Sequence, residues 1–312
     1  MDLKGKKILV TGGAGFIGSH IVDRLIEIGA HPVVLDNLIS GKIENIKQYV
    51  GKIDIFQGDI TNEEDLHRAM RGVEYVIHQA ALRSVPKSFE MPETYTRVNV
   101  IGTQMILEMA CRMGIKKVAM ASSSSVYGDS STFPQIEEFK VKPISPYALS
   151  KLLMEEMAKF YTRMYGIKTA CLRYFNVFGE RQSIDDECAV VIPKFISCVK
   201  NGQAAPIYGD GLQERDFTYV GNVVDANIKA LEEDTYEHTT LNIGGGNPVS
   251  INKLLDTICH HIDTGKGAEY LSPRSGDVRR SHAGISKAYR IIRWRPEVSF
   301  EEGIKRTING VS

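Results

Sequence analysis

A tyrosine and a lysine stand four residues apart in the stretch SPYALSK, which covers residues 145–151. The proline suits the first turn of a helix, and residues four apart on a helix are neighbours on one face. The ammonium group of Lys151 would therefore lie beside the phenol of Tyr147 and favour its phenolate form. A phenolate available near neutral pH can act as a general base. Because the same spacing is common on solvated helix faces, the pair indicates catalysis only together with other residues.

A run of four serines, in ASSSSVYG at residues 121–128, places hydroxyl groups at the end of an apolar, strand-like segment. In an open parallel sheet, ligands bind beyond the carboxyl ends of the strands. Hydroxyl groups at that position can bridge a base and a substrate alcohol. Serine is also a common turn residue, so not all four serines are expected to be functional.

Glycines three apart, at Gly12, Gly15 and Gly18, connect the first strand-like run to the first helical segment. Glycine permits the tight turn and lets the backbone approach a pyrophosphate, to which the helix N-terminus offers N–H donors. Asp36 ends the second strand-like run, where a carboxylate can bind an adenosine ribose and repel a 2′-phosphate. The sequence therefore predicts a dinucleotide site that prefers NAD to NADP. Asp59, which ends the third run, is as good a candidate for a turn residue as for a contact to the adenine amine.

The elements that must position these residues follow an alternating pattern over the first 175 residues. Short apolar runs are expected to be strands at residues 7–11, 32–36, 54–59, 73–80, 117–123 and 169–175, with helical segments between them. This alternation predicts an α/β fold, a Rossmann doubly wound parallel sheet. Beyond Phe175 the loops lengthen and Gly and Pro cluster, which predicts a smaller, irregular C-terminal region. We expect a dinucleotide-binding domain at 1–175, with later contributions from about 210–240, and mainly a substrate-binding domain at 176–312.

The composition excludes several classes of partner. Lys plus Arg and Asp plus Glu are 38 each, so there is no electrostatic reason to expect nucleic acid or an anionic membrane. No apolar stretch approaches the roughly 18 residues of a membrane span, and no signal peptide is visible, so a cytoplasmic protein is expected. The five cysteines are scattered without a CxxC pair, which predicts neither a metal site nor a disulfide framework.

Seven motifs, in the order in which they occur along the chain, resemble those of the extended short-chain dehydrogenase/reductase superfamily. Within this superfamily they resemble the NAD-dependent UDP-hexose and UDP-N-acetylhexosamine 4-epimerases. The motifs are TGGAGFIG, HQAALRSV, ASSSSVYG, SPYALSK, LRYFNVFG, YGDGLQERDFTYV and NIGGG, and the resemblance runs from about Lys7 to beyond Ser286. It implies that NAD stays bound while a UDP-sugar is oxidised at C4 to a ketone and reduced again on the other face. The C-terminal region would then bind the nucleotide-sugar.

The resemblance also implies roles for individual residues. Tyr147 is the catalytic acid and base, Lys151 supports it and holds the nicotinamide ribose, and Ser123 is the catalytic serine. The expected cofactor-binding residues are Gly12, Gly15, Phe16, Ile17, Asp36, Asn37, Asp59, Ile60, Ala80, Asn99, Tyr147 and Lys151. The expected substrate-binding residues are Ser84, Ser123, Ser125, Tyr147, Asn176, Arg215, Arg274 and Ser281. The two arginines are expected to hold the diphosphate.

Ser281 stands where the resemblance places the residue that selects the sugar. Family members restricted to plain hexoses have a tyrosine there, and those that accept N-acetylhexosamines have a small residue. A serine leaves room for a 2-acetamido group, to which Ser84 could add a hydrogen bond, although removing a clash permits binding without compelling preference. The alternative is that Ser281 merely caps the following helix. We therefore expect interconversion of UDP-N-acetylglucosamine and UDP-N-acetylgalactosamine, with UDP-glucose and UDP-galactose also accepted.

Other activities of the same superfamily leave different signatures. The 4,6-dehydratases carry an Asp-Glu pair where this chain has Ser124 and Ser125, which argues against dehydration. Arg83 could pair with a C6 carboxylate, so a UDP-uronate 4-epimerase or decarboxylase is the alternative. A non-enzymatic NAD-binding regulator would be expected to lose the Tyr147–Lys151 pair, which this chain keeps.

The sequence also leads us to expect a homodimer. Six of the ten methionines lie in the helical segments 93–113 and 147–165, which the resemblance pairs with their copies across a homodimer interface. Methionine is also an ordinary core residue, so this composition alone does not establish the interface.

Overall fold

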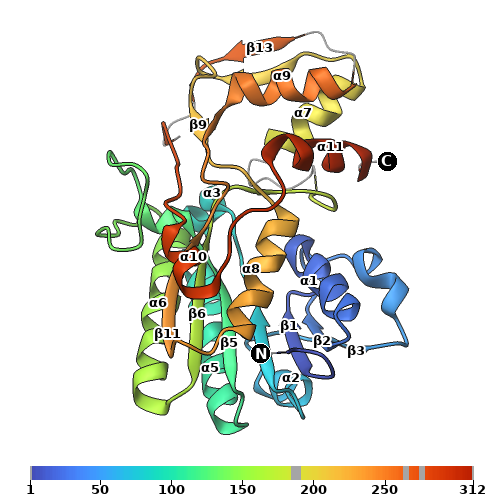
Figure 1. The fold of residues 1–312 in the computed structure, drawn as a ribbon, viewed down its shortest axis with the longest axis vertical. Helices are drawn as coiled ribbons and strands as arrows, with labels where there is room; N and C mark the ends of the chain where they lie inside the picture. Colours follow the sequence, from blue (N-terminus) through green and yellow to red (C-terminus); the bar gives the residue numbers. More distant parts are fainter. Residues whose placement is uncertain (1, 184–190, 263–266, 274–277, 311–312) are drawn as a thin grey trace.

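The computed structural model describes residues 2–183, 191–262, 267–273 and 278–310. Within these ranges the chain forms a seven-stranded parallel sheet in the order β11-β6-β5-β4-β1-β2-β3 (Figure 1). Its strands are β1 (Lys7–Thr11), β2 (His31–Asp36), β3 (Asp54–Gln57), β4 (Tyr75–His78), β5 (Lys117–Ser123), β6 (Lys168–Tyr174) and β11 (His238–Ile243). The α/β prediction is confirmed, and each of the six expected strands is present, with shifts of at most two residues at its ends.

Helices cover both faces of this sheet (Figure 1). One face carries α1 (Phe16–Glu27) and α8 (Val220–Glu232), and the other carries α2 (Glu63–Ala69), α5 (Gly102–Arg112) and α6 (Pro146–Tyr165). Successive residues of β1 therefore enter different apolar clusters: Ile8 and Val10 join one, and Leu9 joins the other. Burial on both faces is the physical reason why these strands read as continuous apolar runs.

Helix α6 begins and ends where the sequence signals are strongest. The Ser145 hydroxyl accepts the N–H of Ala148 at 3.1 Å as an N-cap, and Pro146 occupies the first helical position. Gly166 closes the helix with φ of +74°, a left-handed conformation that glycine adopts without steric cost. The capped first turn holds Tyr147 at the sheet edge where the strands end.

The expected helix at 93–113 is present with an irregular middle. It consists of α4 (Pro92–Tyr95), a π-helical segment η2 (Thr96–Ile101) and α5. Single π-helical turns within helices often occur at functional sites. Asn99, which we predicted to be near the cofactor, lies within this π-helical segment.

The later part of the chain contributes to both ends of the molecule. Strand β11 and helix α8 lie beyond residue 175 yet pack with the first six strands. A second group of elements stands above the sheet in Figure 1: α7 (Val191–Lys200), α9 (Ile251–Ile262), α11 (Phe300–Gly310), and the parallel pair β8 (Ala205–Tyr208) with β13 (Ala268–Leu271). The shorter elements are η1 (Ile43–Tyr49), α3 (Val85–Glu90), η3 (Ser124–Tyr127), β7 (Val177–Phe178), β9 (Glu214–Arg215), β10 (Thr218–Tyr219), β12 (Val249–Ser250) and α10 (Ser286–Ile292).

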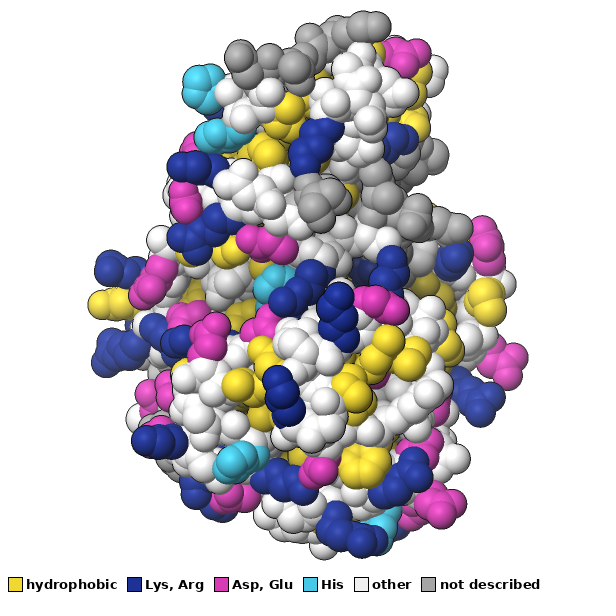
Figure 2. All heavy atoms as spheres, turned by 90° about the vertical axis from the view of Figure 1, so that its right-hand side faces the viewer, with side chains coloured by type: hydrophobic (Ala, Val, Ile, Leu, Met, Phe, Trp, Pro, Cys, Tyr) yellow, Lys and Arg dark blue, Asp and Glu magenta, His cyan; other side chains and the backbone are white. Residues whose placement is uncertain are grey.

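The surface gives no sign of a single dominant charge on the face drawn in Figure 2, where basic and acidic side chains are interspersed. In the described ranges, no helix combines the length and the apolar character that crossing a membrane requires. The same residues contain no cluster of three or more His, Cys, Asp or Glu side chains arranged to hold a metal ion.

Candidate active site

A cleft of about 1300 Å³ runs along the carboxyl ends of the strands and reaches the elements above the sheet. Residues from both ends of the chain line it, from Gly12 in the glycine loop to Ser281 near the C-terminus. This is the position at which ligands bind in doubly wound sheets. The residues predicted from the sequence can therefore be assigned to parts of one cleft.

The glycine loop packs so tightly that side chains are excluded. A Cβ atom at Gly12 would lie 2.8 Å from the backbone nitrogen of Ala80, and one at Gly18 would lie 2.1 Å from the carbonyl oxygen of Gly12. Gly15 is the N-cap of α1, and the following residues Phe16 and Ile17 line the cleft together with Ala80. The start of α1 therefore faces the cleft with its N–H groups, an arrangement that suits a pyrophosphate.

The carboxylate of Asp36 lies at the end of β2 and lines the cleft. It accepts the N–H groups of Ala14 at 3.0 Å and Leu38 at 2.8 Å, and burial raises its pKa. Asp59 accepts from the Asn37 amide at 2.9 Å. Burial acts to raise the pKa of Asp59, but its hydrogen bonds outweigh burial and hold that pKa below its usual value.

These residues fit the adenosine half of a dinucleotide. Asp36, Asn37, Asp59 and Ile60 all line the cleft beside the start of α1. A helix N-terminus for the pyrophosphate and a carboxylate at the end of the second strand are the two features that an NAD-type cofactor requires there.

The catalytic tyrosine and serine predicted from the sequence both line the cleft, and the predicted lysine lies behind them. Tyr147 and Ser123 line it, and Lys151 lies behind Tyr147 with its Nζ 6.0 Å from the centre of the phenol ring. The Lys151 ammonium is 3% exposed, donates to the carbonyl oxygen of Ala121 at 2.8 Å, and burial lowers its pKa to about 8. The Ser125 hydroxyl, which also lines the cleft, donates to the Ser123 hydroxyl at 2.9 Å.

The far end of the cleft brings Asn176, Arg215 and Ser281 together. The Asn176 amide donates to the Ser281 hydroxyl at 2.9 Å, which also accepts the backbone N–H of Asp216 at 3.1 Å. The Asp216 carboxylate in turn accepts the N–H of Ala283 at 2.8 Å, and burial raises its pKa to about 6. Ser281 is therefore held on a segment that is fixed from two sides.

Two predicted residues lie behind the cleft wall. Asn99 is fully buried; its amide donates to the carbonyl oxygen of Leu82 and to Ser150, and accepts the N–H of Leu82 at 2.8 Å. Ser84 is buried and accepts the N–H of Lys87 at 3.3 Å as the N-cap of α3. Both side chains stabilise the backbone that forms the wall, and their direct contact with ligands stays a prediction.

One predicted residue, Arg274, lies outside the described residues. A residue that the sequence reasoning missed is Arg280, which lines the cleft next to Ser281. Its Nε lies 3.0 Å from Glu214, and its guanidinium stands 5.2 Å from the centre of the Phe133 ring. The sequence did offer a signal for Arg280, because it is a basic residue directly before Ser281, the predicted sugar-selecting residue.

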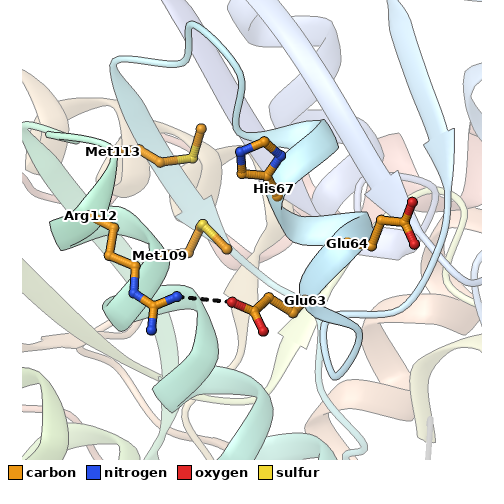
Figure 3. Close-up of a pocket in the computed structure, with 6 residues that line it drawn as sticks. All are labelled: Glu63, Glu64, His67, Met109, Arg112 and Met113. Atoms are coloured by element: carbon orange, nitrogen blue, oxygen red, sulfur yellow. Dashed lines mark hydrogen bonds and ion pairs between the residues drawn. The ribbon is translucent and has the colours of Figure 1, made fainter.

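A second hollow, of about 560 Å³, is distinct from this cleft. Figure 3 shows its six lining residues, among them Met109, Met113 and an ion pair between Arg112 and Glu63 at 2.9 Å. None of the six lines the cleft, and the ion pair is exposed. The cleft, rather than this hollow, contains the chemically competent residues.

Comparison with known proteins agrees with this assignment. The profile of the NAD dependent epimerase/dehydratase family matches residues 8–244. A putative UDP-glucose 4-epimerase of Methanocaldococcus jannaschii is 45% identical over 304 residues, 97% of both chains. A UDP-glucuronate 4-epimerase of Thermodesulfobacterium geofontis is 36% identical, covering 96% of this chain and 94% of the relative. The solved UDP-N-acetylglucosamine 4-epimerase of Methanobrevibacter ruminantium M1, in complex with UDP-N-acetylmuramic acid, superposes with a TM-score of 0.94 at 40% identity, covering 98% of both chains.

The chain belongs to the NAD dependent epimerase/dehydratase family. The resemblance found in the sequence is thereby confirmed, and its cofactor is NAD. By class the protein is a nucleotide-sugar 4-epimerase, an isomerase.

Cofactor choice provides a first test. We expect the purified protein to release NAD on denaturation, without NADP, because Asp36 would face the 2′-phosphate and contact between like charges costs several kcal/mol. Asp36→Asn removes the negative charge but keeps the size of the side chain. It also keeps one of the two oxygens that accept the N–H groups of Ala14 and Leu38. This variant should bind NADP more tightly than the wild type does. Chromatography of the released nucleotide and titration with both cofactors measure these effects, and NADP in the wild-type extract would contradict the role of Asp36.

Proposed function

We propose that the protein interconverts UDP-N-acetylglucosamine and UDP-N-acetylgalactosamine, and also UDP-glucose and UDP-galactose, through a 4-keto sugar. The C4–H bond of a sugar is not acidic, so simple proton exchange cannot invert this carbon. Bound NAD supplies a hydride acceptor and then the same hydride for return. The protein must therefore move one proton, hold the diphosphate, and let the sugar turn between the two transfers.

Tyr147 is the residue proposed to move the proton. It lines the cleft at the start of α6, and the buried ammonium of Lys151 behind it favours the phenolate. Tyr147 takes the proton of the 4-hydroxyl and returns it after the sugar has turned. Ser123, beside it on the cleft wall, orients that hydroxyl, and Ser125 holds the Ser123 side chain.

The diphosphate is proposed to bind at the far end of the cleft. Arg215 and Arg280 both line the cleft there, and arginine forms charge-assisted hydrogen bonds to phosphate oxygens. Arg274 is proposed as a further ligand from its place in the sequence. Binding at the diphosphate anchors the substrate while the sugar reorients.

Ser281 is the observation that favours an N-acetylated sugar. It lines the cleft, and the hydrogen bond from the Asn176 amide at 2.9 Å places it beside another proposed substrate residue. It does not cap the following helix, because α10 begins at Ser286 with Ile285 at its N-cap position. The small side chain at this point leaves space that a larger residue would fill, which supports acceptance of a 2-acetamido group.

Incubation with single substrates tests the proposal. The purified protein is incubated separately with UDP-N-acetylglucosamine, UDP-glucose and UDP-glucuronate, and the products are identified by NMR. We expect epimerisation of the first two. Arg83 lines the cleft and could bind a C6 carboxylate, so turnover of UDP-glucuronate alone would replace the proposal by the uronate alternative.

We also propose that the protein forms a homodimer through α6. Four of the apolar side chains exposed on this helix recur on one face: Leu149, Leu153, Phe160 and Met164, each 40–57% exposed. Of the six methionines that suggested the interface, Met109 and Met154 are buried, three more pack against an apolar core cluster, and Met164 alone belongs to the exposed stripe. The exposed stripe, rather than the methionine content, is what supports a second copy as the partner.

The dimer is tested by placing a charge within this stripe. Leu153→Glu should convert a dimer into a monomer without unfolding the chain, because the side chain is exposed in the single chain. Light scattering coupled to gel filtration measures the mass. Leu271→Glu, at an exposed apolar position of β13 far from α6, is the matched control and should leave the mass unchanged. A wild-type protein that runs as a monomer would refute the proposal.

A further inference from the structure

A buried ion pair joins helix α6 to strand β6 behind the catalytic end of the cleft. The Glu155 carboxylate accepts from Nε of Arg173 at 2.9 Å and from its Nη2 at 2.8 Å. The two side chains are 5% and 6% exposed, respectively. A forked pair of this kind is rigid, because both hydrogen bonds fix the plane of the guanidinium against the carboxylate.

The pair is connected to the elements that carry the proposed catalytic residues. The Ser122 hydroxyl donates to the Glu155 carboxylate, and Ser122 directly precedes Ser123 at the end of β5. Arg173 also donates to the Tyr127 hydroxyl at 2.9 Å, in the segment η3 that follows β5. The pair therefore ties the end of β5 to the helix that presents Tyr147.

The network continues to the sugar-selecting segment. The Tyr127 hydroxyl donates to the Asn242 side chain of β11 at 2.8 Å. The Asn242 amide donates to the carbonyl oxygens of Gln135 and Gly284, and Gly284 lies three residues after Ser281. These hydrogen bonds satisfy the buried polar groups, so the network is costly to disturb at any one member.

Glu155 also lies one helical turn after Lys151 on α6, so the two side chains share a face. In the described part of the chain, the titratable groups that face Lys151 are Tyr147, Glu155, Cys171 of β6 and His78 of β4. Burial lowers the pKa of His78 to about 3 and raises that of the Cys171 thiol well above its usual value, so both are neutral. Glu155 is therefore the protein carboxylate that can balance the buried ammonium of Lys151.

We propose that Glu155 and Arg173 are a positioning pair for catalysis: Arg173 fixes the place of the Glu155 carboxylate on the face of α6 that carries Lys151 and ties β5 to α6, and the negative charge of Glu155 keeps the ammonium of Lys151 behind Tyr147. This inference rests on the roles of Tyr147 and Lys151 proposed above. Neither Glu155 nor Arg173 lines the cleft, so the pair acts through Lys151 and Ser122 rather than on the substrate.

The proposal predicts how kcat depends on the protonation of Lys151, and in which direction each variant changes this dependence. The wild type should lose activity as the pH rises through the pKa of Lys151, because the neutral amine no longer favours the phenolate. Burial lowers that pKa to about 8, and Cys171 and then Glu155 oppose the shift. Because burial keeps the Cys171 thiol neutral in this pH range, Glu155 supplies the opposing negative charge. Removing this charge should therefore move the alkaline limb of the kcat profile to lower pH.

The test compares three variants over a pH series, using whichever UDP-sugar the wild type turns over. In Glu155→Gln the alkaline limb should move down by about one pH unit, since one neighbouring charge shifts a pKa by that order. In Arg173→Gln the limb should move up, because Glu155 keeps its charge and loses its balancing cation. In the double variant the limb should lie below that of the wild type by less than in Glu155→Gln. Glu155 shares a face of α6 with Lys151, whereas Arg173 lies on the neighbouring strand β6, so the loss of Glu155 should outweigh the loss of Arg173.

Folding is followed by thermal melting and by bound NAD. A single variant can fail to fold because it leaves one buried charge unpaired. In that case the double variant, which removes both charges, is decisive: its alkaline limb should lie at a lower pH than that of the wild type. Glu302→Gln breaks the exposed 2.7 Å pair with Arg306 on α11 and should leave the profile unchanged. If these variants melt at a lower temperature but keep the alkaline limb of kcat at its wild-type pH, the pair only stabilises the fold and the proposal is wrong. Activity of Tyr147→Phe equal to that of the wild type would instead refute the underlying catalytic roles.

Discussion

Replacing Tyr147 with phenylalanine is expected to lower kcat by about 10²–10⁴-fold, the usual cost of losing a general base. The substitution removes a single oxygen from a side chain that lines the cleft at the start of α6. The ring that faces the Lys151 ammonium at 6.0 Å is kept, so the fold and bound NAD should be retained. The measurement is the rate of product formation at saturating substrate, with the melting temperature and NAD content recorded on the same preparation.

Tyr127→Phe provides a comparison for this result. Tyr127 is buried, and its hydroxyl binds Arg173 and Asn242 rather than facing the cleft. Loss of that hydroxyl should lower the melting temperature while leaving much more activity than Tyr147→Phe leaves. If both variants kept near-normal turnover, the proton would have to be moved by another group, and the assignment of Tyr147 would be wrong.

Replacing Ser281 with tyrosine should abolish the reaction of the N-acetylated pair while the plain hexose pair survives. The phenol ring would enter the cleft where Ser281 now leaves space beside Asn176. A 2-acetamido group needs that space and a 2-hydroxyl does not. We therefore expect the ratio of the two kcat/KM values to change by about 100-fold, since even one misplaced methylene group changes such a ratio by about 10- to 200-fold. Parallel assays of UDP-N-acetylglucosamine and UDP-glucose with the wild type and the variant give this ratio.

The control is Ser281→Ala. Tyrosine at this position also removes the hydroxyl that accepts from the Asn176 amide and from the N–H of Asp216. Alanine removes those hydrogen bonds without filling the space, so it should weaken both reactions equally and modestly. Equal loss of both reactions in Ser281→Tyr would mean that the sugar is selected elsewhere in the cleft.

Local sequence signals were enough to predict six of the seven strands of the sheet and both ends of helix α6. Apolar runs buried on both faces defined the strands from β1 to β6, and the Pro146 and Gly166 signals defined α6. The glycine spacing of the first turn was equally informative, because a Cβ at Gly12 would meet the backbone at Ala80. In each case the constraint acts within a few residues or repeats with a period that the sequence displays.

The order of the motifs along the chain then indicated the family, because several of them follow the end of a strand and one begins helix α6. Tyr147, Ser123, Asp36 and Asn176 all line one cleft although they come from different parts of the chain. Their placement was predictable because the carboxyl ends of parallel strands meet at a single edge.

Only the tertiary structure decided which of the other predicted side chains reach the cleft. Asn99 and Ser84 do not line the cleft: the Asn99 side chain binds the backbone of Leu82, and Ser84 caps α3. The contact between Asn176 and Ser281, and the pair formed by Glu155 with Arg173, likewise join residues far apart in the chain. Such contacts depend on where elements such as the π-helical segment η2 and strand β11 place the backbone in three dimensions. A buried polar group must find its partner in three dimensions, and the residue type alone does not say which partner that is.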